Sequence, residues 1–215
     1  MNYHNFISKR LQPLLDGVLR DYTSQASDMY KQAQDNTKSK YTSRIALNAQ
    51  SYDRHWTANE RLYELALNYD DIVVDILSNK KNSFYTVIQQ DNVVVTISQV
   101  SSPGEMVRNS KFRNNFAYRY GANRSLFDDQ TFSVPSLDDT IYAVILHGPI
   151  SQKDANIGFL NIATIDANFS EYSYNESLFE LCSIKHPFKL SEAPVTPLDN
   201  GNAVTIKLKS GIDPR

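Results

Sequence analysis

The chain has 215 residues, of which 41% are hydrophobic and 21% are charged, and its formal net charge is −2. These values are typical of a folded protein that buries its own core, and they exclude a disordered chain or a surface coated in positive charge. No run of residues approaches the roughly 18 apolar residues that a membrane-spanning helix needs. We therefore expect no membrane association, and any contact with nucleic acid has to be a local patch.

The single cysteine, Cys182, excludes an intrachain disulfide and argues against a cysteine-based metal site. The first residues, MNYHNFISKRLQ, contain no apolar signal segment. We therefore predict a cytoplasmic location, where thiols stay reduced.

Residues 1–82 are predicted to form a helical region. Pro13 and Gly17 interrupt its first apolar stripe, which indicates either one kinked helix or a short helix before a longer one. The polar segment 35–43 predicts a break. The apolar residues of the stripe recur at intervals of three and four, as on one face of a helix: Ile7, Leu11, Leu14, Val18, Tyr22, Ala26, Met29 and Ala33.

A second helix is predicted to begin at Thr57. Thr57 and Glu60 have the spacing of a capping box, in which each side chain satisfies a backbone N–H of the first turn. Lys80 and Lys81 then stand where the negative end of the helix dipole favours cations. The apolar residues between these signals again recur at intervals of three and four: Leu62, Leu65, Tyr69, Ile72 and Ile76.

Residues 83–215 are predicted to be rich in strands. The β-branched segment 83–100 is typical of a hairpin. Residues 140–147 and 157–165 are almost continuously apolar, which predicts central strands that are covered on both faces. A late strand is predicted at 203–209.

A second capping-box pattern runs from Ser173 to Glu176 and predicts a short helix after it. Helices come first and strands follow without alternating with helices. We therefore predict an α+β fold, with N-terminal helices packed on a mostly antiparallel β-sheet and one short helix near the C-terminus. The two regions, 1–82 and 83–215, are expected to form one compact unit.

Residues 112–120 alternate in character, which predicts another strand. Arg113 and Arg119 fall on one face of this strand and are expected to point into solvent. The aromatic residues fall on the other face and are expected to cover the core: Phe112, Phe116, Tyr118 and Tyr120.

A basic segment covers residues 104–124. Clustered cations neutralise phosphates, so this segment is a candidate surface for nucleic acid or another anion. Its cations are Arg108, Lys111, Arg113, Arg119 and Arg124, with support from Lys38, Lys40, Arg44, Lys80 and Lys81. The alternative is a solvated face whose cations pair, with little gain in stability, with the acidic residues that follow: Asp128, Asp129, Asp138 and Asp139.

A metal-dependent nuclease is the enzymatic alternative to a binding protein. Such enzymes hold Mg²⁺ with acids, often beside a lysine in the pattern acid-x-Lys on a strand. The nearest match, Thr205-Ile-Lys207 after Asp199, lacks the acid, so no metal ligand is predicted and the catalytic residues stay unknown. The candidate acids are Asp70, Asp71 and Asp75, predicted on a helix, and Asp138 and Asp139, before a strand.

The histidines are too widely spaced for a zinc motif: His4, His55, His147 and His186. We interpret His147, which follows an apolar strand, as a histidine satisfied at a turn. Cys182 and His186 are four residues apart, but Pro187 predicts the end of a helix there, and Cys182 is interpreted as a small core residue. No cofactor is predicted.

These observations favour a non-enzymatic binding protein that recognises an anionic partner, such as nucleic acid, or a protein partner through the basic segment. The N-terminal helices offer a second contact surface. A homodimer is a further expectation, because two-fold dimers are the commonest soluble oligomers. A structural or oligomerisation subunit is the third interpretation.

Overall fold

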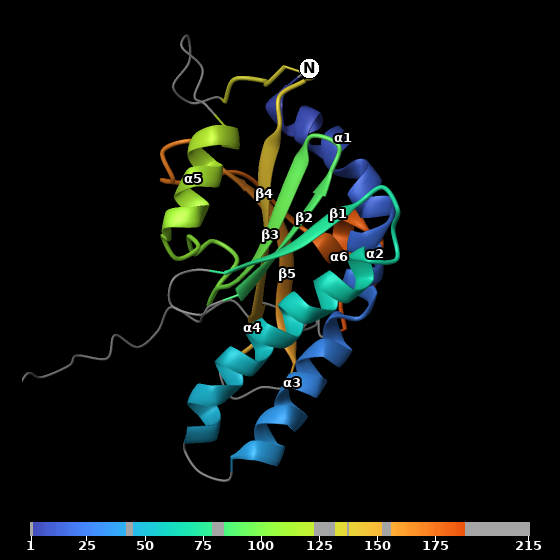
Figure 1. Ribbon diagram of the computed structural model, residues 1–215, viewed down its shortest axis with the longest axis vertical. Helices are drawn as coiled ribbons and strands as arrows, with labels where there is room; N and C mark the ends of the chain where they lie inside the picture. The colour runs from blue at the N-terminus through green and yellow to red at the C-terminus, as the bar shows by residue number, and fades with distance from the viewer. Residues whose placement is uncertain are drawn as a thin grey trace, which may run out of the picture.

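In the computed structural model, the described part of the chain forms six helices and one six-stranded sheet (Figure 1). The described residues are 2–41, 45–78, 84–122, 132–136, 138–151 and 156–187. Helices dominate the N-terminal part and strands dominate the rest, so the predicted α+β class is confirmed.

Four helices precede the sheet: α1 (Tyr3–Asp16), α2 (Val18–Ser24), α3 (Ala26–Lys40) and α4 (Ile45–Ala66). Every residue of the predicted stripe from Ile7 to Ala33 is buried, which confirms the stripe. Gly17 lies between α1 and α2, whereas Pro13 lies inside α1. The predicted break at 35–43 is wrong as far as Lys40, because Thr37 is buried and its hydroxyl donates to Asp53 of α4 at 2.6 Å.

The helix predicted from Thr57 is wrong at both ends. Thr57 lies in the interior of α4, where it is buried, so the capping-box spacing there is a chance match. The chain turns after Ala66, and Ile76 belongs to strand β1 (Val73–Ser78). Ile72 and Ile76 are four residues apart, which keeps two side chains on one face of either a helix or a strand. The spacing therefore could not distinguish the two.

The strands follow one another across the sheet in the order β1-β2-β3-β4-β5-β6. All neighbours are antiparallel except β3 and β4, which run parallel. The remaining strands are β2 (Phe84–Gln90), β3 (Val93–Gln99), β4 (Ile141–Pro149), β5 (Ile157–Ile165) and β6 (Tyr172–Ser177). The predicted hairpin and both predicted central strands are thus confirmed, whereas 203–209 lies outside the described residues.

The capping box predicted from Ser173 to Glu176 is wrong, because these residues belong to β6 and pair with β5. The short helix itself is present as α6 (Leu178–Leu181). Cys182 follows it as a buried residue, as predicted.

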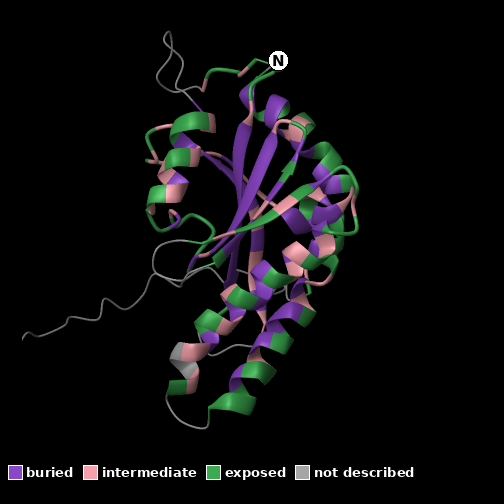
Figure 2. Ribbon diagram, in the orientation of Figure 1, coloured by how far each residue is buried: buried purple, intermediate pink, exposed green. Residues whose placement is uncertain are grey.

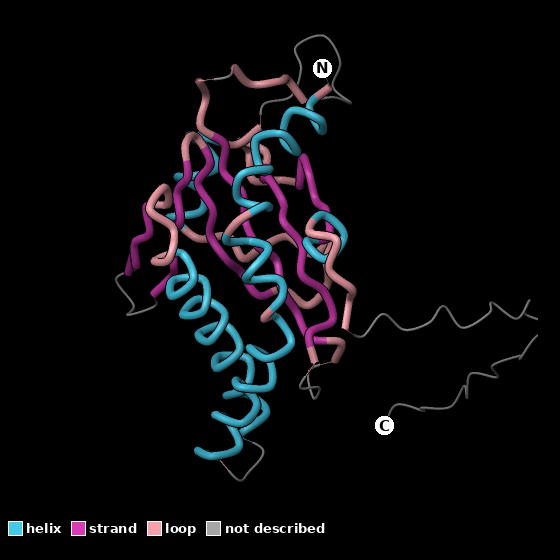
Figure 3. The backbone as a smooth tube through the Cα atoms, turned by 90° about the vertical axis from the view of Figure 1, so that its right-hand side faces the viewer, coloured by secondary structure: helices cyan, strands magenta, loops and turns pink. Residues whose placement is uncertain are grey.

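The sheet has helices on both faces. The helices α1, α2, α3, α4 and α6 contribute to one layer, and α5 (Lys111–Tyr120) lies on the opposite face (Figures 1 and 3). One apolar cluster joins the first layer to the sheet, and a second lies under α5. β4 contributes to both clusters, with every residue from Ile141 to Gly148 buried (Figure 2).

The strand predicted at 112–120 is wrong, because these residues form α5. Phe112, Phe116 and Tyr120 are again four residues apart, so one spacing fits both structures. The helical geometry changes which residues of the basic segment face solvent. Arg113 turns inward with Ala117, whereas Tyr118 is 83% exposed.

We expect Gly121→Ala to lower the free energy of unfolding by about 2 kcal/mol, because overpacking a filled site has a cost of this order. A Cβ atom there would lie 2.8 Å from the Ile165 carbonyl oxygen and 2.9 Å from the Ala167 nitrogen. The matched control is Gly104→Ala, where a Cβ atom would meet nothing within 4 Å. Urea unfolding of both variants measures the difference, and equal effects would contradict the close packing of α5 against β5.

Candidate functional site

Three of the sequence-predicted cations that are described and exposed lie at α5. Arg108 precedes the helix, while Lys111, Tyr118 and Arg119 lie on its solvent side. Residues seven or eight apart on a helix lie within about one face. We call these four residues the α5 basic surface. α5 itself contains no acid, and no ion pair among the described residues involves the three cations of this surface.

The other predicted cations do not extend this surface in the described part of the chain. Lys38 and Lys40 lie at the end of α3, where the Lys40 ammonium is 3.9 Å from an Asp53 carboxylate oxygen. Arg124 lies outside the described residues, as do Arg44, Lys80 and Lys81.

Arg113 belongs to the interior. It is only 8% exposed, its guanidinium donates to the carbonyl oxygens of Arg108 at 3.1 Å and Ile97 at 3.4 Å, and it lies 4.8 Å from the centre of the Phe112 ring. Burial lowers the pKa of Arg113. The expectation that Arg113 points into solvent is therefore wrong, because its side chain packs in the interior of the described fold.

Arg113 reaches the place where β2 and β3 stop pairing. Their register ends at Val87 and Thr96 although both strands continue. On the other face, Asn59 of α4 accepts from the Thr86 backbone N–H at 2.9 Å. Side chains from both layers thus satisfy backbone groups that the sheet leaves unpaired, as buried polar groups require.

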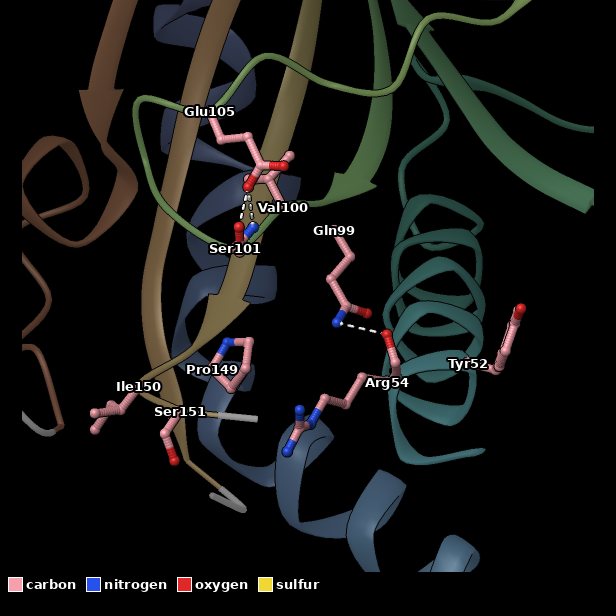
Figure 4. A pocket seen from close by; sticks show the side chains of 10 residues that line it. Tyr52, Arg54, Gln99, Val100, Ser101, Glu105, Pro149, Ile150 and Ser151 are labelled. Atoms are coloured by element: carbon pink, nitrogen blue, oxygen red, sulfur yellow. Dashed lines mark hydrogen bonds between the residues drawn. The ribbon is translucent and has the colours of Figure 1, made fainter. Parts of the chain in front are cut away.

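A pocket of about 740 Å³ lies at the carboxyl ends of β3 and β4 (Figure 4). The parallel pairing places Gln99 opposite His147, so both strands end at this edge. The lining residues come from α4, from the ends of β3 and β4 and from the loops that follow them: Ser51, Tyr52, Arg54, Gln99, Val100, Ser101, Glu105, Pro149, Ile150 and Ser151. Arg54 extends from α4 toward the cavity, whereas Tyr52 points away from it.

A buried polar cluster lies beside Arg54. The Tyr30 hydroxyl is 2.8 Å from His147 Nδ1, and the His55 ring lies parallel to the His147 ring with centroids 6.3 Å apart. The Arg54 guanidinium carbon is 5.6 Å from the centre of the Tyr30 ring. His147 is completely buried, and its Nε2 atom has no hydrogen-bond partner among the described residues.

The histidines of this cluster are neutral at neutral pH. Burial lowers the pKa of His147 to about 3, helped by the neighbouring His55 and by the charge of Arg54. Burial also lowers the pKa of His55 to about 4, helped by the charge of Arg113. Burial raises the pKa of Tyr30, which stays protonated. Arg54 is therefore the charged member of the cluster.

Sequence reasoning identified His147 but not its neighbours. Its Nδ1 atom lies 2.8 Å from the Tyr30 hydroxyl inside the core, whereas a histidine satisfied at a turn was predicted. Tyr30, Arg54 and His55 lie on helices about a hundred residues away in the chain, and no spacing within the sequence links them to the end of β4. The one sequence signal for this cluster was the apolar strand that ends in His147.

The candidate acids do not assemble in the described part of the chain. Asp70 and Asp71 lie in the turn after α4, and Asp75 lies on β1, so their assignment to a helix is wrong. Asp139 accepts from the Ser136 backbone N–H at 2.7 Å, and Asp138 is exposed beside it. The described residues contain no group of three or more His, Cys, Asp or Glu side chains that could hold a metal ion.

Within the described ranges, no helix has the length and apolar character to cross a membrane. Comparison with known proteins finds no matching family model, no similar curated protein and no similar solved structure. Function is therefore inferred from the α5 basic surface.

We expect the protein to lose stability below about pH 6.5. His55 and His147 stay neutral when folded, with pKa values of about 4 and about 3, whereas a histidine in the unfolded chain takes up a proton near its ordinary pKa of 6.5. Between these values the unfolded state binds more protons, so each histidine lowers stability by about 1.4 kcal/mol per pH unit of acidification.

Urea unfolding between pH 7 and pH 4.5 measures this dependence. His147→Gln removes one of the two titrating groups and should reduce the slope by about 1.4 kcal/mol per pH unit, whatever its effect at pH 7. An unchanged slope in this variant would show that His147 is protonated equally in both states.

Proposed function

We propose that this chain is a binding protein that recognises a polyanion, with nucleic acid as the partner class, through the α5 basic surface. The observation that carries the proposal is the combination of two exposed cations and an exposed tyrosine on a helix that contains no acid, with the exposed Arg108 just before that helix. Cations neutralise backbone phosphates, and an aromatic ring stacks on an unpaired base.

The geometry of α5 suits a strand that runs along it. Lys111 and Arg119 are eight residues apart, which corresponds to about 12 Å along the helix axis. They can therefore contact different phosphates of one strand. Tyr118 lies on the same side of the helix and is 83% exposed, so its ring is available for stacking.

The small number of cations limits the strength of binding. Each phosphate contact contributes about 0.9 to the slope of log K against log salt on duplex DNA and about 0.7 on single strands. With three cations, the expected slope is about −2 to −3. The net charge of −2 supplies no general attraction, so binding depends on this patch.

We expect Lys111→Ala/Arg119→Ala to weaken binding of labelled oligonucleotides and to reduce the salt slope by about 2, because two phosphate contacts are lost. Fluorescence anisotropy from about 50 to 200 mM salt measures both quantities. The matched control is Lys9→Ala/Arg20→Ala, which removes two exposed cations from α1 and α2 on the other layer. Equal binding by both double variants would contradict the proposal.

We expect Tyr118→Ala to weaken binding of single strands by about tenfold and to leave duplex binding unchanged, because stacking on an unpaired base is worth about 1–3 kcal/mol. Tyr52→Ala is the control, since Tyr52 is also exposed, at 71%, but lies on α4. Anisotropy with a single strand and its duplex makes the comparison. A loss shared by both nucleic acids would assign Tyr118 a role other than stacking.

A cytoplasmic location, a homodimer and a protein partner stay predictions from the sequence. Size-exclusion chromatography with light scattering decides the oligomeric state, and it is also needed to express the affinities above per protomer.

A further inference from the structure

The outer side of α4 carries a row of apolar residues that the fold leaves half-buried or exposed. Arg54 and Ala58, each two residues from a member of this row, lie on the opposite side of the helix, and both are buried. α4 therefore has one side packed in the fold and a second, apolar side toward solvent. The residues of this α4 apolar row are seven and four residues apart in turn, which keeps them on one side of a helix: Ile45, Tyr52, Trp56, Tyr63 and Leu67.

Strand β2 adds a third aromatic ring to the exposed part of this row. Phe84, its first residue, lies edge-on to Trp56, with ring centroids 6.4 Å apart and an interplanar angle of 71°. Tyr52 points away from the pocket (Figure 4). Contiguous exposed aromatic residues mark an interaction surface. The row contains no lysine or arginine, so it does not suit the polyanion proposed for α5.

We propose that the α4 apolar row is the interface of a two-fold dimer, in which α4 of a second copy of this chain packs antiparallel against it about Trp56. This dimer goes beyond polyanion binding and uses another layer of the fold, because α4 and α5 lie on opposite faces of the sheet (Figures 1 and 3).

The row is complementary to itself. In a two-fold interface each contact is made twice, with the roles of the two copies exchanged. Tyr52 stands four residues before Trp56, and the exposed Glu60 stands four residues after it. Antiparallel packing about Trp56 therefore brings each Tyr52 hydroxyl to Glu60 of the partner subunit, and a tyrosine hydroxyl can donate to a carboxylate. The acid that interrupts the row thus gains a partner in the dimer.

The exposed aromatic area is large enough to form the centre of such an interface. Tyr52 is 71% exposed, Trp56 is 54% exposed and Phe84 is 49% exposed. Since an aromatic side chain buries about 200 Å², these three supply about 350 Å² per copy and about 700 Å² per dimer. Stable interfaces bury about 1,200–2,000 Å² in total, so three side chains provide more than half of the lower limit.

The test is light scattering during size-exclusion chromatography of the full chain, loaded at high and at low micromolar concentration. We expect the mass of two chains at high concentration. Trp56→Glu places two like charges at the centre of the interface and should weaken dimerisation by about a hundredfold or more, because aromatic residues at an interface centre contribute most to binding. Val134→Glu is the matched control, since it changes an exposed apolar residue before β4 and should leave the mass unchanged.

A pair of variants at Tyr52 tests the antiparallel packing. Tyr52→Glu brings an acid to Glu60 of the partner subunit and should dissociate the dimer. Tyr52→Lys brings a cation to the same carboxylate and should dimerise more tightly than Tyr52→Glu, because opposite charges attract and like charges repel. Equal dimerisation of the two variants would contradict the packing about Trp56.

The fluorescence of Trp56 gives a second measurement that needs no substitution. Trp56 is the only tryptophan of the chain, so its emission reports on the row itself. We expect the emission of the unchanged protein to move to shorter wavelength as concentration rises and the dimer covers the ring. Tyr52→Glu should emit at the longer wavelength of an exposed ring throughout.

Three outcomes would overturn the proposal. The first is a single-chain mass at high concentration, and the second is a dimer that persists unchanged in Trp56→Glu. The third is a single chain whose Trp56 emission is already that of a shielded ring, which would mean that the same chain covers the row.

The dimer and the polyanion function fail separately. Lys111→Ala/Arg119→Ala should keep the mass of two chains, and Trp56→Glu should keep the binding of a short oligonucleotide per protomer. Because affinities are expressed per protomer, Tyr52→Ala stays a control for stacking even where it weakens the dimer. A dimer that is lost in the α5 double variant and retained in Trp56→Glu would place the interface at α5, and the proposal would be wrong.

Discussion

The parallel pairing of β3 with β4 is the constraint on which the rest of the structure depends. Antiparallel neighbours can be joined by a short turn, but parallel neighbours need a crossover from one end of the sheet to the other. The chain therefore leaves the sheet after Gln99, passes through α5 on one face and returns at Ile141. This crossover covers the face that the N-terminal helices leave open, makes β4 a strand buried on both sides, and places the ends of β3 and β4 at one edge, where the pocket lies.

Two arginines are buried on opposite faces of this sheet, and their surroundings differ. Arg113 is enclosed by aromatic rings and backbone carbonyls at the point where β2 and β3 separate, and it bonds to Ile97. Arg54 also lies against a ring, but its side chain borders a cavity. A buried charge is costly unless protein groups pair with it, and the carbonyl oxygens and rings around Arg113 reduce that cost.

Much of the fold could be predicted from the sequence, and the errors have one physical origin. The stripe from Ile7 to Ala33 contains intervals of three as well as four, which only a helix keeps on one face, and it is buried as predicted. The continuous apolar runs of β4 and β5 were equally decisive. Phe112 and Phe116, and likewise Ile72 and Ile76, are four residues apart, which suits a helix and a strand alike. At both places the neighbouring elements decided the structure, and a single sequence does not show them.

The candidate sites depend even more on neighbouring elements that a single sequence does not show. Net charge along the chain identified the basic segment, but the helical geometry of α5 divides it, turning Arg113 inward and leaving Lys111 and Arg119 outside. The pocket was not predicted at all, because Ser51 and Gln99 meet only through the packing of α4 on the sheet. A basic segment in a sequence therefore shows only where charge lies along the chain. Whether the segment can bind a partner depends on which cations are enclosed, which face solvent and which border a cavity, and only the fold shows this.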